Sequence, residues 1–172
     1  MAVTPRAAGD VLTAAIFNTK LEAPILLSEL AAGPLCIVRH SVDQTAANLE
    51  NQILSFDTEV RDPDGQHEGA TNPSRITILV AGPYWLSCAV AFASSGAGFR
   101  AVTFAKNAGV VLGIKIAAAF VGEQTIISHG FWAELAVSDY VYVYAYQNSG
   151  GALAIPMRNG HTPQFAAKLG QP

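Results

Sequence analysis

The clearest pattern in the chain is the strict alternation of side chains from Asp139 to Tyr146. Successive residues of a β-strand point to opposite faces. One face of this segment carries Val141, Val143 and Ala145, and the other carries Tyr142, Tyr144 and Tyr146. Both faces are apolar, whereas a strand with one face in water alternates apolar with polar side chains. The pattern therefore predicts a strand whose tyrosine face is also covered.

Short apolar segments separated by turn residues follow one another from Leu35 to Gly170. Asp62-Pro63-Asp64-Gly65 and Asn107-Ala108-Gly109 are typical of turns. The spacing predicts an all-β, antiparallel sandwich of about ten strands. The predicted strands are 35–42, 52–60, 75–80, 84–93, 99–106, 110–116, 125–137, 139–146, 152–157 and 163–169.

The segment 84–93 predicts a second strand with two distinct faces. One face is large and apolar, with Tyr84, Leu86, Cys88, Val90 and Phe92. The other carries Trp85, Ser87, Ala89 and Ala91, whose mostly small side chains allow another surface to approach closely.

Residues 1–34 differ from the rest, and we expect them to form a separate, partly helical extension. Asp10 is a suitable N-cap for a short helix, and Pro24 interrupts the pattern. A helix of this length is marginal in water by itself, so it needs a docking partner. The residues expected to anchor it are Val11, Leu12, Ile16, Phe17 and Leu26. The alternative is a frayed tail.

The composition changes this picture by pointing to association with other chains. Of the 172 residues, 51% are hydrophobic and 13% are charged, against about 25% charged in an average soluble protein.

The net charge of −3 offers no basic surface for nucleic acid. The longest apolar run, Val110 to Gly122, contains Lys115 and is shorter than the roughly 20 residues of a membrane-spanning helix. Asp10 interrupts any secretory signal, so we expect the product to stay in the cytoplasm where it is made.

Candidate chemistry is sparse. The histidines, His40, His67, His129 and His161, do not have zinc-ligand spacing, and Cys36 and Cys88 are expected to be reduced, buried thiols. His40, Ser41 and Asp43 are adjacent on a strand and diverge, so they do not predict a hydrolytic site. Gly96 and Gly98 do not lead from a strand into a helix, which excludes a phosphate-binding loop. No cofactor is predicted.

One group of acidic residues leaves a calcium site as an alternative. Asp62, Asp64 and Glu68 lie in a single loop, and hard oxygen ligands in a flexible loop suit calcium. Their spacing differs from that of an EF-hand, and Asp-Pro-Asp-Gly is explained as a turn without an ion.

The order of these signals resembles the gC1q family, the globular head of the first complement component, which shares a jelly roll with tumour necrosis factor. The resemblance covers residues 35–170. It is carried by Phe56-Asp57-Thr58-Glu59, Ile76-Thr77-Ile78, Ala81-Gly82-Pro83-Tyr84-Trp85-Leu86, Arg100 to Asn107, Ala133-Glu134-Leu135, Asp139-Tyr140-Val141 and Phe165 to Leu169. The chain departs from the family at Ser138, where glycine is common, and at Pro83, where an aliphatic residue is common.

This resemblance implies a homotrimer with one sheet of each sandwich around a threefold axis. It places the strands of Tyr84 and Tyr142 in that inner sheet. The expected interface residues are Trp85, Ser87, Ala89, Ala91, Tyr142, Tyr144 and Tyr146. The start of the chain, Ala8 to Asn18, is similar to the leaders of small virion proteins of phages that infect actinobacteria.

Three hypotheses for function follow. The first is a non-enzymatic virion protein on the particle surface: a trimeric tail-fibre or capsid-decoration module, with its N-terminal segment bound to other virion proteins. It would serve host attachment through a cell-surface glycan, or particle stabilisation. The second is a soluble bacterial lectin or spore-surface adhesin, also trimeric. The third is an enzyme on a jelly-roll scaffold, for which the sequence offers no catalytic set. The loop residues expected to meet a ligand are Asp62, Asp64, His67, Ser95 and Asn148.

Overall fold

The computed structural model describes residues 33–158 and 163–170. Contacts between Cα atoms divide the chain into residues 1–32 and residues 33–172. The helix and the anchoring residues predicted for the N-terminal segment, and His161, lie outside the described residues. Within the described part the chain forms thirteen strands and no helix, which establishes the predicted all-β class. No helix there is long and apolar enough to cross a membrane.

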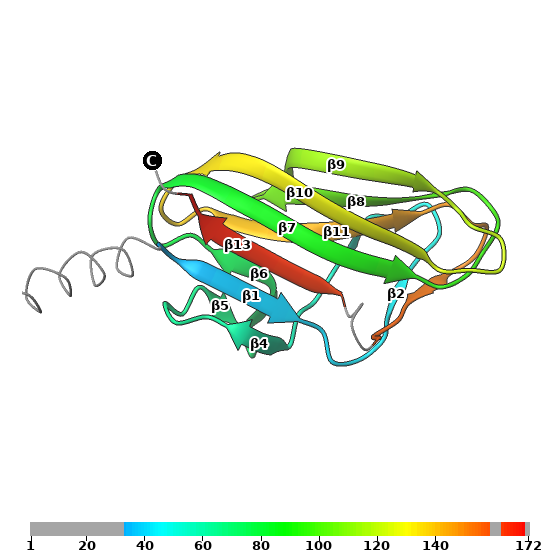
Figure 1. Cartoon of the computed structure of the whole chain (residues 1–172), viewed down its shortest axis with the longest axis horizontal. Coiled ribbons are helices and arrows are strands. Elements are labelled where there is room, and N and C mark those ends of the chain that lie inside the picture. Colours follow the sequence, from blue (N-terminus) through cyan, green and yellow to red (C-terminus); the bar gives the residue numbers. More distant parts are fainter. Residues whose placement is uncertain (1–32, 159–162, 171–172) are drawn as a thin grey trace, which may run out of the picture. The chain divides into compact units, whose positions relative to one another are not determined.

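A five-stranded antiparallel sheet forms one layer of the sandwich (Figure 1). Its strands, in spatial order, are β10 (Thr125–Leu135), β7 (Gly82–Phe92), β13 (Gln164–Leu169), β1 (Leu35–Arg39) and β4 (Thr58–Arg61). The long strands β7 and β10 pair along their whole length, from Thr125 opposite Phe92 to Leu135 opposite Gly82.

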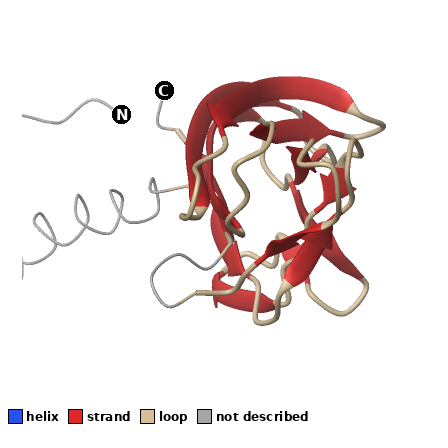
Figure 2. Cartoon of the chain, turned by 90° about the vertical axis from the view of Figure 1, so that its right-hand side faces the viewer, coloured by secondary structure: helices blue, strands red, loops and turns tan. Residues whose placement is uncertain are grey.

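A six-stranded antiparallel sheet forms the other layer. Its path is β5 (His67–Glu68), β6 (Asn72–Thr77), β11 (Tyr140–Gln147), β8 (Phe99–Lys106) and β9 (Val110–Ala118), and β3 (Gln52–Ile53) also pairs with β11. A separate pair joins β2 (Gln44–Ala46) to β12 (Leu153–Ile155). Seen end-on, the strands curve around a common interior (Figure 2).

The core between the sheets contains the residues expected from alternation. Val141, Val143 and Ala145 of β11 are fully buried, as predicted. The centre is aromatic: the ring of Phe165 lies 5.7 Å from that of Phe56 and 5.9 Å from that of Phe104. These rings join the two sheets because Phe165 belongs to β13 and Phe104 to β8.

The strand predictions are confirmed in their order and corrected in detail. The predicted strand 99–106 has the observed bounds of β8, and 139–146 overlaps β11. The predicted strand 52–60 is two strands, β3 and β4, and the short strands β2 and β5 were missed. Very short strands lack enough residues to show an alternation, which explains why the count of about ten was too low.

One topological prediction is wrong. The strands of Tyr84 and Tyr142 do not share a sheet: β7 belongs to the five-stranded sheet and β11 to the six-stranded sheet. Alternation within a strand gives its two faces but does not identify its neighbours, because pairing partners are distant in sequence.

Both cysteines are free and buried, as predicted. Cys36 lies on β1 and Cys88 on β7, and β13 separates these strands. Burial raises the pKa of the Cys88 thiol to about 12. Burial also raises the pKa of Cys36, with the nearby Asp62 carboxylate adding to the effect. Both side chains are therefore neutral thiols at ordinary pH.

Candidate functional site

The outer side of the five-stranded sheet carries two exposed tryptophans that lie side by side. Trp85 on β7 pairs directly with Trp132 on β10, and their ring centroids are 5.4 Å apart. Their exposed fractions are 39% and 56%. Gly130 makes room for the first ring, since a Cβ there would lie 2.3 Å from Cζ2 of Trp85. Exposed aromatic pairs of this kind are characteristic of protein interfaces.

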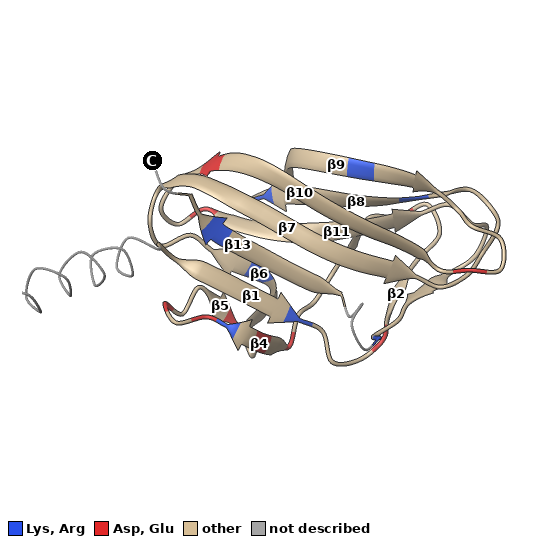
Figure 3. Cartoon of the chain, in the orientation of Figure 1, with Lys and Arg blue, Asp and Glu red and all other residues tan. Residues whose placement is uncertain are grey.

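We call this surface the tryptophan face and define it by Trp85, Ser87, Ala89 and Trp132. Register places all four on one side of β7 and β10, opposite the buried positions. The strands β7, β10 and β13 together contain one acidic residue, Glu134, and one basic residue, Lys168 (Figure 3). The surface is therefore apolar with little charge. Ala91, which was predicted to belong to it, lies on the same side and is buried within the chain.

The tyrosines of β11 lie on the outer side of the other sheet, and the chain itself already covers much of them. Tyr142 is 5% exposed. Its ring stacks on Tyr140 at 6.0 Å and meets Tyr144 edge-on at 5.1 Å, while Tyr146 stacks on Phe99 at 5.5 Å. The predicted interface set is thus divided between two opposite sides of the sandwich, and a single flat interface cannot hold both parts.

The hydroxyl of Tyr142 is also satisfied within the chain. It donates to the backbone carbonyl of Asn107 at 3.0 Å and lies 3.3 Å from the hydroxyl of Tyr144. Burial, with the adjacent Tyr144 hydroxyl, raises the pKa of Tyr142 to about 12. The phenol stays neutral, and it needs no partner from another molecule.

Asp139 links two turns next to β11. Its carboxylate accepts hydrogen bonds from Asn107 Nδ2 at 2.7 Å, Lys106 Nζ at 2.9 Å and the backbone N–H of Ala136 at 3.0 Å. Asn107 Oδ1 in turn accepts from the backbone N–H of Tyr140 at 3.0 Å. These bonds hold the carboxylate in its charged form and lower the pKa of Asp139 to about 2.

This network predicts a specific loss of stability in acid. Because the folded pKa of about 2 lies below the ordinary 3.8, the contribution of Asp139 is complete above pH 3.8 and is lost as the pH falls towards 2. We expect Asp139→Asn to lower the free energy of unfolding by about 1 to 2 kcal/mol at pH 7. Urea titrations should show this difference from the unmodified protein shrinking as the pH falls to about 2.

An exposed carboxylate provides the control for this experiment. Asp64 lies at the surface in the acidic loop, and Asp64→Asn should leave the free energy of unfolding nearly unchanged across the same range. A difference for Asp139→Asn that stays constant from pH 7 to about 2 would contradict the assignment.

The predicted ligand residues of the acidic loop instead hold the loop together. The two carboxylate oxygens of Asp62 accept the backbone N–H groups of Gln66 at 2.9 Å and His67 at 2.8 Å. The ring of His67 is buried, with Nδ1 3.2 Å from Glu59 Oε1 and Nε2 3.3 Å from the carbonyl of Pro73. Asp62 and His67 therefore act first as structural groups.

The calcium alternative gains no support from this geometry. Glu68 accepts hydrogen bonds from Thr71 Oγ1 at 2.6 Å and Asn72 Nδ2 at 3.1 Å, away from the backbone groups that bind Asp62. Across the described residues, no three His, Cys, Asp or Glu side chains are grouped so that they could hold a metal ion.

Two of the predicted ligand loops meet at one end of the sandwich. Gly98 has a positive φ of 69°, and a Cβ there would lie 2.1 Å from Oδ1 of Asn148. That same Oδ1 accepts the backbone N–H of Phe99 at 2.6 Å. The structure thus brings Ser95 and Asn148 into adjoining loops, whereas the acidic loop lies beside β4 and β5, away from this end (Figure 1).

A buried arginine that the sequence analysis overlooked fixes the first of these loops. Arg100 is fully buried. Its Nη1 donates to the carbonyls of Ala97 and Phe99, both at 3.0 Å, and its Nη2 donates to the carbonyl of Ser95 at 3.0 Å. A charged donor bound to three backbone acceptors holds residues 95–99 in one conformation.

The hydrolytic set rejected on sequence grounds is not assembled in the fold. The Ser41 hydroxyl donates to Asp57, and Asp43 accepts the backbone N–H of Met157 at 2.8 Å. Neither ring nitrogen of the buried His40 has a hydrogen-bond partner among the described residues. The three residues therefore have different surroundings, and no serine–histidine contact forms.

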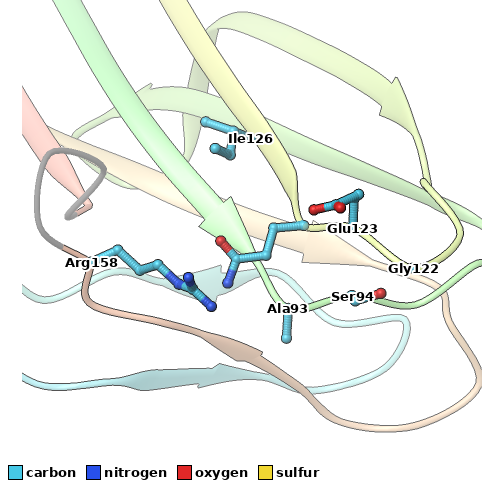
Figure 4. A pocket seen from close by; sticks show the side chains of 7 residues that line it. Ala93, Ser94, Gly122, Glu123, Ile126 and Arg158 are labelled. Atoms are coloured by element: carbon cyan, nitrogen blue, oxygen red, sulfur yellow. The ribbon is translucent and has the colours of Figure 1, made fainter.

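A pocket of about 400 Å³ includes Ser94, the neighbour of Ser95 (Figure 4). It is lined by Ala93, Ser94, Gly122, Glu123, Gln124, Ile126 and Arg158. When the Gln124 amide is assigned with its oxygen facing the guanidinium, it accepts hydrogen bonds from Arg158 Nε at 3.0 Å and Nη2 at 3.1 Å. None of the three charged or amide side chains was a predicted site residue, because they come from separate loops with no common motif.

Comparison with solved structures identifies the fold. The globular domain of the zebrafish complement 1qA protein is similar with a TM-score of 0.56 and 14% identity, covering 79% of this chain and 96% of that one. Murine APRIL has a TM-score of 0.59 and 11% identity, with coverages of 80% and 98%. Eiger TNF from S. frugiperda has a TM-score of 0.57 and 8% identity, with coverages of 81% and 95%.

These likenesses establish a jelly-roll sandwich of the C1q and tumour necrosis factor type. They confirm the fold implied by the sequence resemblance. No protein-family model and no curated protein sequence matches the chain. At such low identities the similarity concerns the fold alone.

Proposed function

We propose that the protein is a non-enzymatic homotrimer displayed on the surface of a phage particle, where it serves host attachment or particle stabilisation. The observation that carries the assembly is the tryptophan face. Two exposed indoles on a surface with little charge leave a large apolar area in water, and a second chain would cover it. The gC1q-like sequence resemblance supports three copies around one axis.

The proposed trimer interface, or seam, contains Trp85, Ser87 and Ala89 from the interface residues predicted from sequence. It adds Trp132, which pairs with Trp85. A stable interface buries about 1,000 Å² or more, and its centre is commonly aromatic. Tyr142, Tyr144 and Tyr146 remain a separate interface prediction on the other sheet. Their internal contacts make the tryptophan face the better candidate.

The leader supports the virion assignment, because residues 8–18 resemble those of small phage virion proteins. In this arrangement the apolar N-terminal segment binds other virion proteins, and the sandwich projects from the particle. Threefold clustering increases the strength of weak contacts with a cell-surface glycan. The alternative is a soluble bacterial trimeric lectin or spore-surface adhesin, which would bind sugar without belonging to any particle.

Deleting residues 1–32 tests whether the N-terminal segment anchors the protein while the sandwich forms the trimer. We expect the shortened chain to stay folded and trimeric, because residues 33–172 form their own compact unit. It should fail to enter phage particles, because it has lost the segment proposed to bind other virion proteins. The measurement is immunodetection in purified particles, with the full chain as control and electron microscopy to locate it. Incorporation of the shortened chain at the level of the full chain would contradict the anchoring role, and absence of the full chain from every particle favours the soluble lectin.

A further inference from the structure

The pocket in Figure 4 is built from three chain segments that are well fixed relative to one another. Ala93 follows β7, Gln124 precedes β10, and Arg158 follows β12. Pairing of Thr125 with Phe92 fixes the first two segments. A hydrogen bond from the backbone N–H of Ala93 to the carbonyl of Ala154, at 2.8 Å, joins the third. The walls are therefore held by strands rather than by loops alone.

The polar side chains of the pocket converge from these segments. The contacts of Gln124 Oε1 with Arg158, at 3.0 and 3.1 Å, tie the amide and the guanidinium together. Figure 4 shows the Arg158 side chain extending from one side of the pocket, with Glu123 and Ser94 on the other side. Gln124 is half-buried, whereas Ser94, Glu123 and Arg158 are exposed. The pocket therefore combines a hydrogen-bonded, half-buried amide with exposed side chains that a ligand can reach.

The chemistry of the lining selects one class of ligand. Glu123 provides acceptors, Arg158 provides donors, and Ser94 and Gln124 provide both. Ile126 and Ala93 add a small aliphatic wall. A sugar has hydroxyl groups that both donate and accept hydrogen bonds, and its ring carbons present C–H surfaces between them. A sugar therefore matches this mixture of polar and aliphatic side chains. A pocket of about 400 Å³ is at the small end of the range for ligand sites.

Other ligand classes fit less well. A phosphate or nucleotide would meet the carboxylate of Glu123, and no aromatic side chain lines the pocket to stack on a base. A lipid chain would cover the charged and amide groups with hydrocarbon, which cannot replace their contacts with solvent. A neutral, hydroxyl-rich ligand satisfies all of them without introducing a repelled charge.

We propose that this pocket binds one neutral sugar unit of a surface polysaccharide. The inference rests on the proposed surface role and names the class of ligand and the residues that meet it. It moves the ligand site from the loop residues predicted from sequence to Ser94, Glu123, Gln124 and Arg158. A shallow pocket of this size binds a single sugar weakly, with a dissociation constant of about 1 mM. Three copies in one particle component would supply useful avidity.

The test is a binding measurement on the full-length protein. Saturation-transfer NMR would be recorded with methyl glycosides of glucose, galactose, mannose and N-acetylglucosamine, and with glucose 6-phosphate as a charged probe. We expect at least one neutral glycoside to bind and the phosphate ester to bind more weakly. Gln124→Ala and Glu123→Gln should each weaken the binding by about tenfold or more, because the first removes an amide that bonds the sugar and the second replaces a charged acceptor with a neutral amide.

Glu50→Gln provides a matched control, since Glu50 is an exposed acid outside the pocket. It should leave sugar binding unchanged, and circular dichroism should show that all three variants are folded. Failure of every neutral glycoside to bind, or unchanged binding to both Gln124→Ala and Glu123→Gln, overturns the proposal. Stronger binding of glucose 6-phosphate than of any neutral sugar also overturns it.

These outcomes are distinct from those that decide the proposed function. A chain that is found in phage particles but binds no glycoside refutes only the sugar site. A chain that binds a glycoside through Gln124 but belongs to no particle refutes the virion role and leaves the sugar site intact.

Discussion

Trp132→Glu should convert the proposed trimer into single chains. The substitution places a carboxylate at the most exposed ring of the tryptophan face, beside Trp85 at 5.4 Å between ring centroids. In an interface that excludes water an unpaired charge costs several kcal/mol per chain, and the proposed trimer would contain three such charges. Multi-angle light scattering should give the mass of one chain for the variant and of three chains for the unmodified protein.

Tyr144→Glu is the matched substitution on the opposite sheet. Tyr144 is half-buried and contacts Tyr142 within its own chain. If the seam is the tryptophan face, this variant should retain three chains while losing some stability. Dissociation by Tyr144→Glu with an intact Trp132→Glu trimer would assign the seam to the tyrosine side, as first predicted for Tyr142, Tyr144 and Tyr146. A stable monomer of the unmodified protein would refute both assignments.

Phe165→Ala should cause the largest loss of stability among single substitutions in the core. Phe165 is fully buried and joins the sheets through ring contacts with Phe56 and Phe104. Removing a buried phenyl ring leaves a cavity, and the free energy of unfolding should fall by about 3 to 5 kcal/mol. Urea unfolding, monitored by circular dichroism, measures this quantity.

Phe120→Ala is the control for that experiment, because Phe120 is an exposed ring on the loop before β10. Its effect should lie within about 0.5 kcal/mol. Both variants must be compared at one chain concentration, since the stability of an oligomer depends on concentration. A loss of less than about 1 kcal/mol for Phe165→Ala would contradict the central role of this ring.

Local patterns predicted the strands and their faces well. The alternation in β11 correctly identified Val141, Val143 and Ala145 as core residues, and the turn at Asn107 correctly separated β8 from β9. The assignment of strands to sheets could not be derived in the same way. β7 is paired with β13 and β10, which lie far from it in sequence, and no pattern within β7 encodes that choice.

The candidate sites were predicted only in part, for a related reason. Trp85 was recognised because it alternates with small residues along β7, but Trp132 becomes significant only through its register opposite Trp85. Gln124 and Arg158 meet across a pocket although 34 positions separate them in the chain. Arg100 appeared to be an ordinary strand residue because its backbone acceptors lie in a loop. Sites made by tertiary proximity leave no periodic signal.

The two buried thiols make the fold independent of redox conditions. Cys36 and Cys88 lie on strands separated by β13, and neither takes part in a disulfide. Burial suppresses the thiolate, which is the form that reacts with oxidants and disulfides. A chain made in a reducing cytoplasm and then exposed to air would keep the same covalent structure in both places. Reductants should leave the fold of the described residues intact.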